Sequence, residues 1–358
     1  MKKHAFLIIL LLCVSVISAQ EIIENPNKPL SKNAGRILQI KEEFRISDES
    51  GEYFFRRPHN FRIAKNGNLF VQDREHLLQF DSEGTYIRDL FKKGQGPGEI
   101  EEYFSYSIFQ DEICIYDSLA IKFIHFDMEG NFIHQVKFEH GPYGSFYGTL
   151  GNWYMFLKNI IPPLSEFNNK LYDSKIAIKL VSKDGEIEKD NHVLSQKVFL
   201  DSNGRMISME LLISVLSANN DVLYVSQTNE YLIEALDLEK GQILRRFSRN
   251  YPRIKHVKQK WEDDLNKKYN VPIMRFESDI AGLFINKDLV WVKTSTKDEE
   301  KGCLIDVFDS SGKYIDNFYL KLNGSLLAAH GNYFFVLEPD AEENLQIVKY
   351  KIVNDNSQ

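Results

Sequence analysis

The sequence is poor in features that define several common protein classes. It has 3 cysteines and 10 prolines in 358 residues, whereas the disulfide-stabilised domains of secreted proteins are small and dense in cysteine. Its longest apolar run, residues 6–17, is too short for a transmembrane helix, which needs about 20 residues. Positive charge is not in excess either, because 51 acidic residues outweigh 44 basic ones. The net charge of −7 argues against a general nucleic-acid-binding protein.

Aromatic residues are abundant instead. The chain has 25 Phe, 17 Tyr and 3 Trp, and these residue types favour the half-buried surface of a β-sheet. Hydrophobic residues make up 43% and charged residues 27%, as in ordinary globular proteins. The composition therefore favours a globular, β-rich protein and excludes disorder and a multi-span membrane protein.

The first 19 residues have the pattern of a secretory signal peptide. Lys2 and Lys3 precede the apolar run, and Ser18 and Ala19 supply the small residues of a cleavage site. An uncleaved membrane anchor is the alternative. We interpret Cys13, inside the apolar run, as part of the signal. Cleavage after Ala19 predicts an exported chain of residues 20–358 with a net charge of −9, in the periplasm, at the cell surface or secreted.

Cys114 and Cys303 are the two remaining cysteines. Both lie in strand-like runs, EICIYD and GCLIDVF, and neither belongs to a CxxC or a Cys/His spacing. We expect two buried free thiols, on opposite sides of the ring of repeats described next.

A repeat extends along the whole chain. Residues 66–88 and 111–133 each contain two alternating apolar strands, then Asp-x-x-Gly and a further strand, with equivalent glycines 46 residues apart. The glycine supplies the positive φ of a hairpin turn. Four further copies follow, at 176–187, 221–243, 288–315 and 332–352.

With one short apolar stretch upstream, each copy has four strands in 40–50 residues, which is typical of a β-propeller blade. A parallel solenoid is the alternative. We predict an all-β, six-bladed propeller of four-stranded antiparallel blades with a short helical insertion. The blades are expected at about 58–92, 103–139, 143–190, 209–248, 278–320 and 325–353. The last copy is one strand short, and residues 36–46 are predicted to complete it and close the ring.

Residues 58–98 resemble the NHL repeat, in their "hydrophobic-Val-x-Asp" and "Phe-Asp-x-x-Gly" elements. They are more specifically similar to secreted bacterial six-bladed β-propellers that carry Gly-x-Gly-Pro-Gly-Glu, here residues 94–99. The resemblance is strong over 58–138 and fades beyond. It implies the propeller fold and a place outside the cytoplasm. Such propellers include binding modules, sensors and a few hydrolases or lyases, so the fold does not give the function.

Several repeat residues are predicted to lock turns. Asp73 and Asp117 recur at the end of a second strand, where a carboxylate can accept backbone N–H groups. The alternative is a ring of carboxylates that holds a cation in the central channel. The turn-lock set also includes the glycines Gly84, Gly130, Gly96 and Gly98. The GQGPGEI segment is not a phosphate loop, because acidic residues follow it instead of Lys-Ser/Thr.

Local motifs for catalysis are missing. The histidines form neither HxH nor HExxH, and there is no Gly-x-Ser-x-Gly. We predict no cofactor and no catalytic residue. The alternative is a metal-assisted hydrolase or lyase with a divalent cation in the central channel, held by ligands from separate blades.

Two segments depart from the repeat, residues 191–209 and 245–276. Residues 245–260 hold seven Lys or Arg and no acid, and apolar residues at three- and four-residue steps up to Tyr269 predict an amphipathic helix. One interpretation is a helix packed on the propeller with solvated cations. The other is a basic lip for a protein or an acidic glycan. We predict an exported, non-catalytic binding module whose ligand-binding residues are Arg249, Arg253, His256, Lys258 and Trp261.

Overall fold

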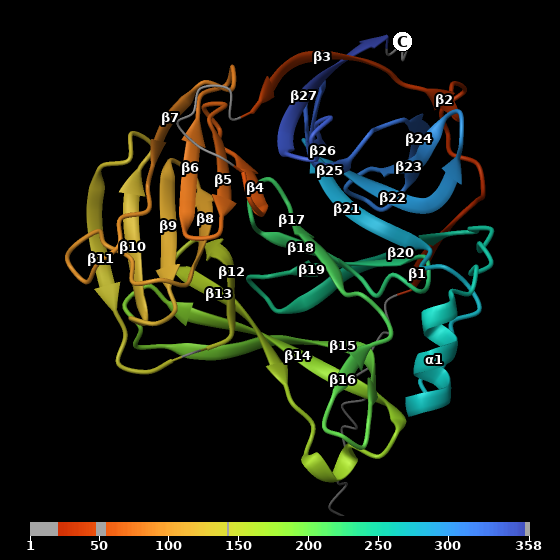
Figure 1. The fold of residues 1–358 in the computed structure, drawn as a ribbon, viewed down its shortest axis with the longest axis horizontal. Coiled ribbons are helices and arrows are strands. Elements are labelled where there is room, and N and C mark those ends of the chain that lie inside the picture. Colours follow the sequence, from red (N-terminus) through yellow and green to blue (C-terminus); the bar gives the residue numbers. More distant parts are fainter. Residues whose placement is uncertain (1–20, 48–54, 142, 355–358) are drawn as a thin grey trace, which may run out of the picture.

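The computed structural model describes residues 21–47, 55–141 and 143–354. These residues form six β-sheets arranged in a ring (Figure 1). The structure is thus the six-bladed β-propeller that the repeat predicts, and α1 (Lys260–Tyr269) is the one α-helix within the described ranges. The expected signal peptide, residues 1–19, lies outside the described residues.

Blades 1 and 2 are regular four-stranded antiparallel sheets. Blade 1 consists of β4 (Pro58–Ile63), β5 (Leu69–Asp73), β6 (His76–Phe80) and β7 (Tyr86–Asp89). Blade 2 consists of β8 (Phe104–Phe109), β9 (Glu112–Asp117), β10 (Lys122–Asp127) and β11 (Phe132–Lys137). The Asp-x-x-Gly turn joins the third strand to the fourth in both, with Gly84 at φ +85° and Gly130 at φ +76°. A side chain at Gly84 would collide with the ring of Phe44, so glycine is required there for space as well.

Blade 3 is longer than its neighbours. It consists of β12 (Ser145–Leu150), β13 (Trp153–Ile160), β14 (Lys170–Ser182), β15 (Glu188–Leu200) and β16 (Met206–Ser208), with a 3₁₀ turn η2 (Leu164–Glu166) before β14. β14 and β15 pair over their whole length, from Val181 opposite Glu188 to Lys170 opposite Leu200. We call residues 161–174 and 196–208, which reach beyond the end of β13, the blade 3 extension.

The interpretation of residues 191–209 as an insertion is therefore wrong, because most of this segment is the second half of β15 and β16. The prediction missed this strand because most residues of β15 are exposed or only partly buried. The residues from Glu188 to Lys197 therefore do not alternate between apolar and polar. The pattern that reveals a half-buried strand is missing there.

Blades 4 and 5 each have a fifth, parallel strand at the outer edge. Blade 4 consists of β17 (Ile213–Leu216), β18 (Val222–Ser226), β19 (Leu232–Asp237) and β20 (Gln242–Arg249), with β1 (Ile22–Asn25) beside β20. Blade 5 consists of β21 (Ile280–Asn286), β22 (Leu289–Asp298), β23 (Gly302–Phe308) and β24 (Tyr314–Leu320), with β2 (Arg36–Ile37) beside β24. These two added strands were not predicted.

Blade 6 joins the two ends of the chain. It consists of β25 (Ser325–His330), β26 (Tyr333–Pro339), β27 (Leu345–Asn354) and β3 (Gln39–Ile46). β3 pairs antiparallel with β27, with Ile46 opposite Ile347 and Ile40 opposite Ile352. The predicted closure is confirmed for residues 39–46, whereas residues 36–37 belong to blade 5. We call residues 22–46 the N-terminal strap, since they cross the outer edges of blades 4, 5 and 6.

Hydrophobic packing holds neighbouring blades together. The buried apolar residues form six clusters, one at each boundary between two blades. The cluster between blades 2 and 3 is mainly aromatic, with the rings of Phe123 and Tyr154 stacked 3.5 Å apart. Cys114 and Cys303 lie in blades 2 and 5 and are free thiols; Cys114 is buried and Cys303 is partly exposed.

Candidate functional site

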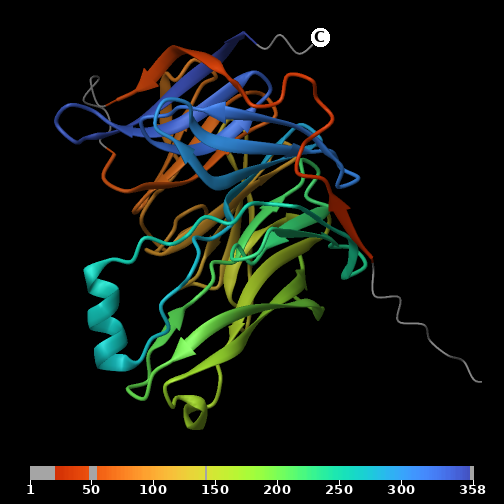
Figure 2. The ribbon, with the colours of Figure 1, turned by 90° about the vertical axis from the view of Figure 1, so that its right-hand side faces the viewer.

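Most irregular segments leave the ring on one face. Strand direction alternates within a blade, so the turn between the second and third strands and the connection to the next blade emerge on the same side. That side carries the β18–β19 turn (227–231), the blade 3 extension and the long connection from β20 to β21. We call this connection, residues 250–279, the excursion. Figure 2 shows its helix α1 standing away from the ring of blades.

The two repeat aspartates bind backbone amides on this face. The carboxylate of Asp73 accepts hydrogen bonds from the backbone N–H of Arg56 (2.7 Å) and Arg57 (2.6 Å). Asp117 accepts from the N–H of Glu101 (2.9 Å) and from two amides of its own turn. Both side chains are buried, so each fixes the connection that enters its blade.

The Gly-x-Gly-Pro-Gly-Glu segment closes on its own glutamate. Glu99 accepts a hydrogen bond from the backbone N–H of Gly96 (2.9 Å) and pairs with Lys92 (3.0 Å). The hydrogen bond from the Gly96 amide and, to a smaller extent, the one from Lys92 lower the pKa of Glu99. Gly98 has φ +75°, a value that favours glycine. The backbone N–H of Gly96 therefore already donates to the Glu99 carboxylate and is not available to a bound phosphate.

Arg249, the first predicted ligand-binding residue, is buried. Arg249 is 6% exposed, and its Nε donates a hydrogen bond to Asp306 Oδ2 over 2.7 Å. The hydroxyls of Tyr231 and Tyr314 also donate to Asp306, at 2.6 Å each. The guanidinium lies within 5.3 Å of the ring centres of Tyr231, Tyr251 and Tyr314. The expectation that Arg249 is a surface residue is wrong: it ties blade 4 to blade 5.

The other predicted cations are also paired. Arg253 Nε lies 3.1 Å from Asp279, and Lys258 pairs with Asp263. His256 bridges two carboxylates, with Nδ1 2.7 Å from Glu277 and Nε2 2.8 Å from Glu262. The hydrogen bond to Glu262, which is the larger cause, and the one to Glu277 raise the pKa of His256.

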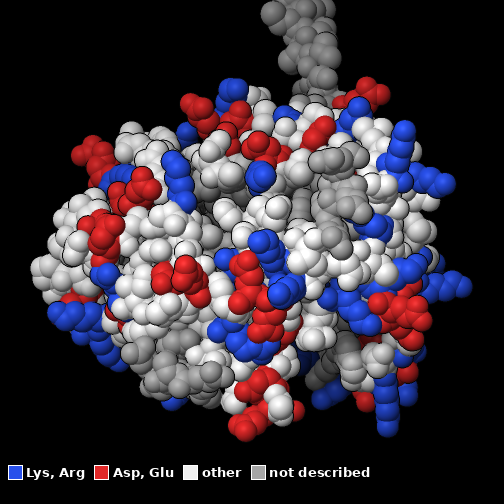
Figure 3. Space-filling model, turned by 90° about the horizontal axis from the view of Figure 1, so that it is seen from above, with Lys and Arg blue, Asp and Glu red and all other residues white. Residues whose placement is uncertain are grey.

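The predicted ligand-binding cations of the basic stretch are therefore not unpaired. Figure 3, a view from above, likewise shows Lys and Arg interspersed with Asp and Glu on the side that it displays. Whether Arg253, His256, Lys258 and Trp261 contact a ligand stays a prediction.

The helix is shorter and more exposed than its apolar pattern predicts. It starts at Lys260 and ends where expected, at Asn270 in the left-handed conformation. None of its residues is buried, and Trp261 is 61% exposed. One contact fixes its end: the Arg205 guanidinium of the blade 3 extension lies 4.0 Å from the centre of the Tyr269 ring. The helix thus rests on the blade 3 extension.

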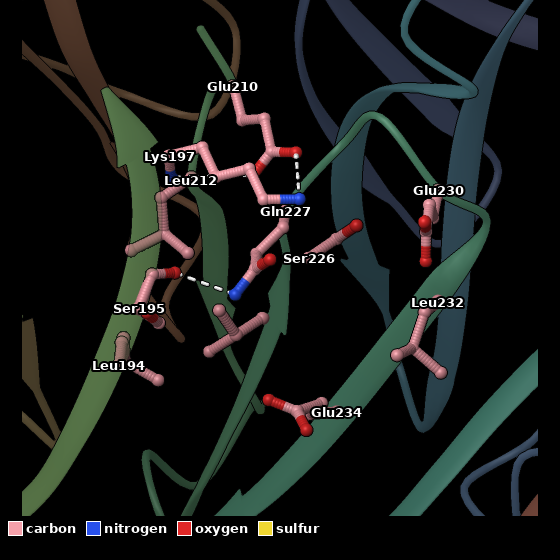
Figure 4. A pocket seen from close by; sticks show the side chains of 11 residues that line it. Leu194, Ser195, Lys197, Glu210, Leu212, Ser226, Gln227, Glu230, Leu232 and Glu234 are labelled. Carbon is pink, nitrogen blue, oxygen red and sulfur yellow. Dashed lines mark hydrogen bonds and ion pairs between the residues drawn. The ribbon is translucent and has the colours of Figure 1, made fainter. Parts of the chain in front are cut away.

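A pocket lies at the boundary between blades 3 and 4, beside the β18–β19 turn. Its cavity volume is about 140 Å³. Its apolar lining continues the hydrophobic cluster between the two blades and comprises Leu194, Leu212, Val225 and Leu232. Its polar lining comprises Ser195, Lys197, Glu210, Ser226, Gln227, Glu230 and Glu234 (Figure 4). None of these residues was predicted from the sequence as a site residue.

The polar side chains are held in place by hydrogen bonds. Gln227 Nε2 donates to the Ser195 carbonyl over 2.7 Å, and Lys197 Nζ lies 3.9 Å from Glu210 (Figure 4). The carboxylate of Glu210 is 9% exposed. Such a lining can accept and donate hydrogen bonds above an apolar floor, as small-ligand sites do.

Asn229 connects the pocket to the excursion. Its Nδ2 donates to Glu210 Oε1 (3.3 Å), while its Oδ1 accepts from Ser278 Oγ (3.3 Å). Its backbone carbonyl accepts from Arg253 Nη2. A predicted site residue thus supports the β18–β19 turn of the pocket without lining the pocket.

Among the residues that the structure describes, no group of three or more His, Cys, Asp or Glu is placed to hold a metal ion. The structure therefore adds no observation in favour of the hydrolase or lyase alternative. In the same ranges, no helix is long and apolar enough to cross a membrane.

Comparison with known proteins supports the fold. The sequence profile of a family described as a 6-bladed beta-propeller, DUF5128, matches residues 50–239. No curated protein matches the chain in sequence. Among solved structures, the chain is similar to a member of the DUF4221 family from Bacteroides vulgatus. That match has a TM-score of 0.50 and 10% identity over 89% of this chain and 99% of the other.

Two further structures show weaker similarity. One is a Bacteroides fragilis protein assigned as exported, with a TM-score of 0.48 and 13% identity over 93% of this chain and all of the other. The other is a virginiamycin B lyase from Staphylococcus aureus, with a TM-score of 0.44 and 10% identity over 88% of this chain and all of the other.

Proposed function

The chain belongs to the DUF5128 family of six-bladed β-propellers, and from that premise we propose that it is an exported, non-catalytic binding module. Its ligand occupies the pocket between blades 3 and 4. Export rests on the sequence of residues 1–19, with its basic start, apolar run and small residues before the cleavage site.

One observation carries the choice of site. The blade 3 extension and the excursion are the two largest departures from a four-stranded repeat; the extension contributes Lys197 to the pocket lining, and the excursion contacts the β18–β19 turn beside it. Arg205 and Tyr269 join them to each other, and Asn229 joins the excursion to the pocket lining. Loops carried on a rigid scaffold are where binding residues concentrate.

The geometry changes the expected ligand. A protein or an acidic glycan was predicted because residues 245–260 hold seven Lys or Arg and no acid, but Arg249, Arg253, His256 and Lys258 each have a carboxylate partner. We therefore propose a protein or another ligand that places one small group in the pocket. A cavity of about 140 Å³ is smaller than the 300–1,000 Å³ that encloses a whole drug-sized molecule.

Two adjacent leucines offer a matched test. Leu212 lines the pocket, whereas Leu211 is 63% exposed and is not part of the lining. Leu212→Trp fills the cavity, and Leu211→Trp adds the same side chain beside it. We expect Leu212→Trp to abolish the binding of small probes and Leu211→Trp to leave it unchanged.

The probes are pentylamine, pentanoate, glucose, glucuronate and capped tripeptides, each titrated into the purified mature protein. Binding is measured from the NMR signals of the lining residues, and circular dichroism shows that both variants are folded. Equal binding to the two variants, or no probe that perturbs the lining, contradicts the proposed site.

A further inference from the structure

The charges of the pocket point to the class of group that it receives. Three carboxylates line it, Glu210, Glu230 and Glu234, against one lysine, Lys197. Glu234 has a partner outside the lining, Arg246 Nε at 2.6 Å, and Glu210 lies 3.9 Å from Lys197. Glu230 forms no ion pair with any residue in the described ranges, and it is exposed. The five charged groups together leave one negative charge uncompensated.

Two of these carboxylates lie on either side of Leu232 in the chain. Leu232 and Glu234 belong to β19 and are two residues apart, so they project to the same side of the strand. Ile233, between them, projects to the other side and is buried against blade 5. Glu230 precedes β19, in the β18–β19 turn, and also lines the pocket.

The pocket is also asymmetric. The Lys197–Glu210 pair lies at one end, whereas Glu234 lies at another, on the wall that carries Leu232 (Figure 4). Lys197 is 57% exposed, so its ammonium is largely hydrated. Beneath the carboxylates, Leu194, Leu212 and Val225 provide apolar contact. A charged head group with an apolar stem matches both parts of this lining.

We propose that the pocket binds a protonated amine or guanidinium at the end of a short aliphatic chain, as in a lysine or arginine side chain. The head group lies at Glu230, the lining carboxylate that has no ion pair in the described ranges, and the stem lies over Leu232 and the apolar floor. This inference rests on the proposed function and specifies its ligand, with the charge opposite to that expected from the basic stretch.

The test compares three probes of equal chain length on the mature protein: pentylamine, pentanol and pentanoate. NMR signals of the pocket residues report occupancy. We expect pentylamine to bind most tightly, and Glu230→Gln to weaken it about tenfold, as the loss of a hydrogen bond to a charged group does. The matched control is Glu239→Gln, an exposed carboxylate in the β19–β20 turn at the other end of the strand, which leaves the affinity unchanged.

Lys197→Met is expected to change the affinity for pentylamine in the opposite direction. It removes the single positive charge of the lining and is expected to tighten pentylamine binding about threefold, a typical effect of one exposed charge. Looser binding would place the amine elsewhere and contradict the inference.

The outcomes separate this inference from the proposed function. If pentanoate binds best and Leu212→Trp removes it, the pocket is a binding site but not for cations. If Glu230→Gln leaves pentylamine binding unchanged, the cation inference is also wrong. If no probe perturbs the lining, both fail.

The source of the cation is tested with a capped Gly-Lys-Gly peptide. Tighter binding of the peptide than of pentylamine assigns the site to a protein ligand. Weaker binding assigns it to a small amine.

Discussion

At the end of the second strand, blades 1 and 2 carry an aspartate and blade 4 carries a glutamine. Asp73 and Asp117 are buried and accept backbone N–H groups of the connection that enters their blade. Gln227 is exposed and lines the pocket. In blade 4 the next residue takes over the turn, because Thr228 Oγ1 accepts the N–H of Leu211 (3.2 Å). In blade 4 the residue that accepts the backbone N–H is thus one position later, and Gln227, at the position of the aspartates, lines the pocket instead.

The outer part of blade 4 also differs from blades 1 and 2 in how it is fixed to its neighbour. Its last strand ends in the buried pair of Arg249 and Asp306, which joins it to blade 5. Blades 1 and 2 are fixed at their entry by carboxylate–amide bonds, whereas blade 4 has a hydroxyl–amide bond at its entry and a buried ion pair at its exit.

The largest expected effect comes from breaking that ion pair. Arg249→Leu leaves Asp306 buried without its counter-charge and should cost about 3–5 kcal/mol of the free energy of unfolding, measured by urea denaturation. Adding Asp306→Asn should restore part of the loss, because a neutral amide needs no counter-charge. Arg45→Leu is the control: the side chains of Arg45 and its partner Glu42 are 37% and 39% exposed, so the loss of this pair should cost about 1 kcal/mol or less. Equal costs for the two arginines would contradict the assignment of Arg249 as the residue that ties blade 4 to blade 5.

An intermediate effect is expected when the two equivalent positions are compared directly. Asp73→Ala leaves two backbone N–H groups without their acceptor and should cost about 2–3 kcal/mol. Gln227→Ala loses one exposed hydrogen bond and should cost less than about 1 kcal/mol. Thermal and urea unfolding of both variants check this difference. Similar losses in both would show that the glutamine also acts as a turn lock.

The smallest effect concerns pH and is local to the excursion. The two glutamates raise the pKa of His256 above its usual value near 6.5, so the stabilisation is complete below that value and is lost as the pH rises through the raised pKa. The Gln259 amide and His256 lower the pKa of Glu262, so its contribution is present above pH 4.5 and lost on acidification below it.

Hydrogen exchange measures this prediction. Protection factors of the α1 amides should be higher at pH 6 than at pH 8.5, whereas those of β5 and β9 should not change. His256→Gln should remove the difference in α1. A pH dependence that persists in this variant would mean that another group anchors the helix.

The sequence predicted the parts of the fold that repeat and missed the parts that depend on distant partners. Asp-x-x-Gly placed the turns at Gly84 and Gly130, and the missing strand of the last copy led to β3. β1 and β2 have no such signal, because four and two residues carry no periodicity and their partners lie more than 200 residues away. The pocket was missed because its lining comes from separate elements, β15, the 209–212 segment, β18, the β18–β19 turn and β19, which meet only when blades 3 and 4 pack.

The predicted binding residues differ from the expectation in the pairing of their charges rather than in their location. The excursion does lie on the irregular face, but Arg249 and Arg253 find their carboxylates 57 and 26 residues further along the chain. Glu262 and Asp263, in contrast, follow His256 and Lys258 within six residues. Their proximity was a signal that part of the basic stretch is neutralised.

The N-terminal strap also sets the order in which the molecule can be assembled. Ile46 belongs to a strand whose partner contains Ile347, so the sixth sheet cannot be completed until both ends of the polypeptide are present. Contacts over roughly 300 residues close slowly, because the entropy of a long loop is lost before they form. Until β27 forms, β3 has no strand to pair with, and the hydrophobic face of blade 1 that packs on blade 6 is uncovered. During synthesis the ring therefore remains open until β27 emerges.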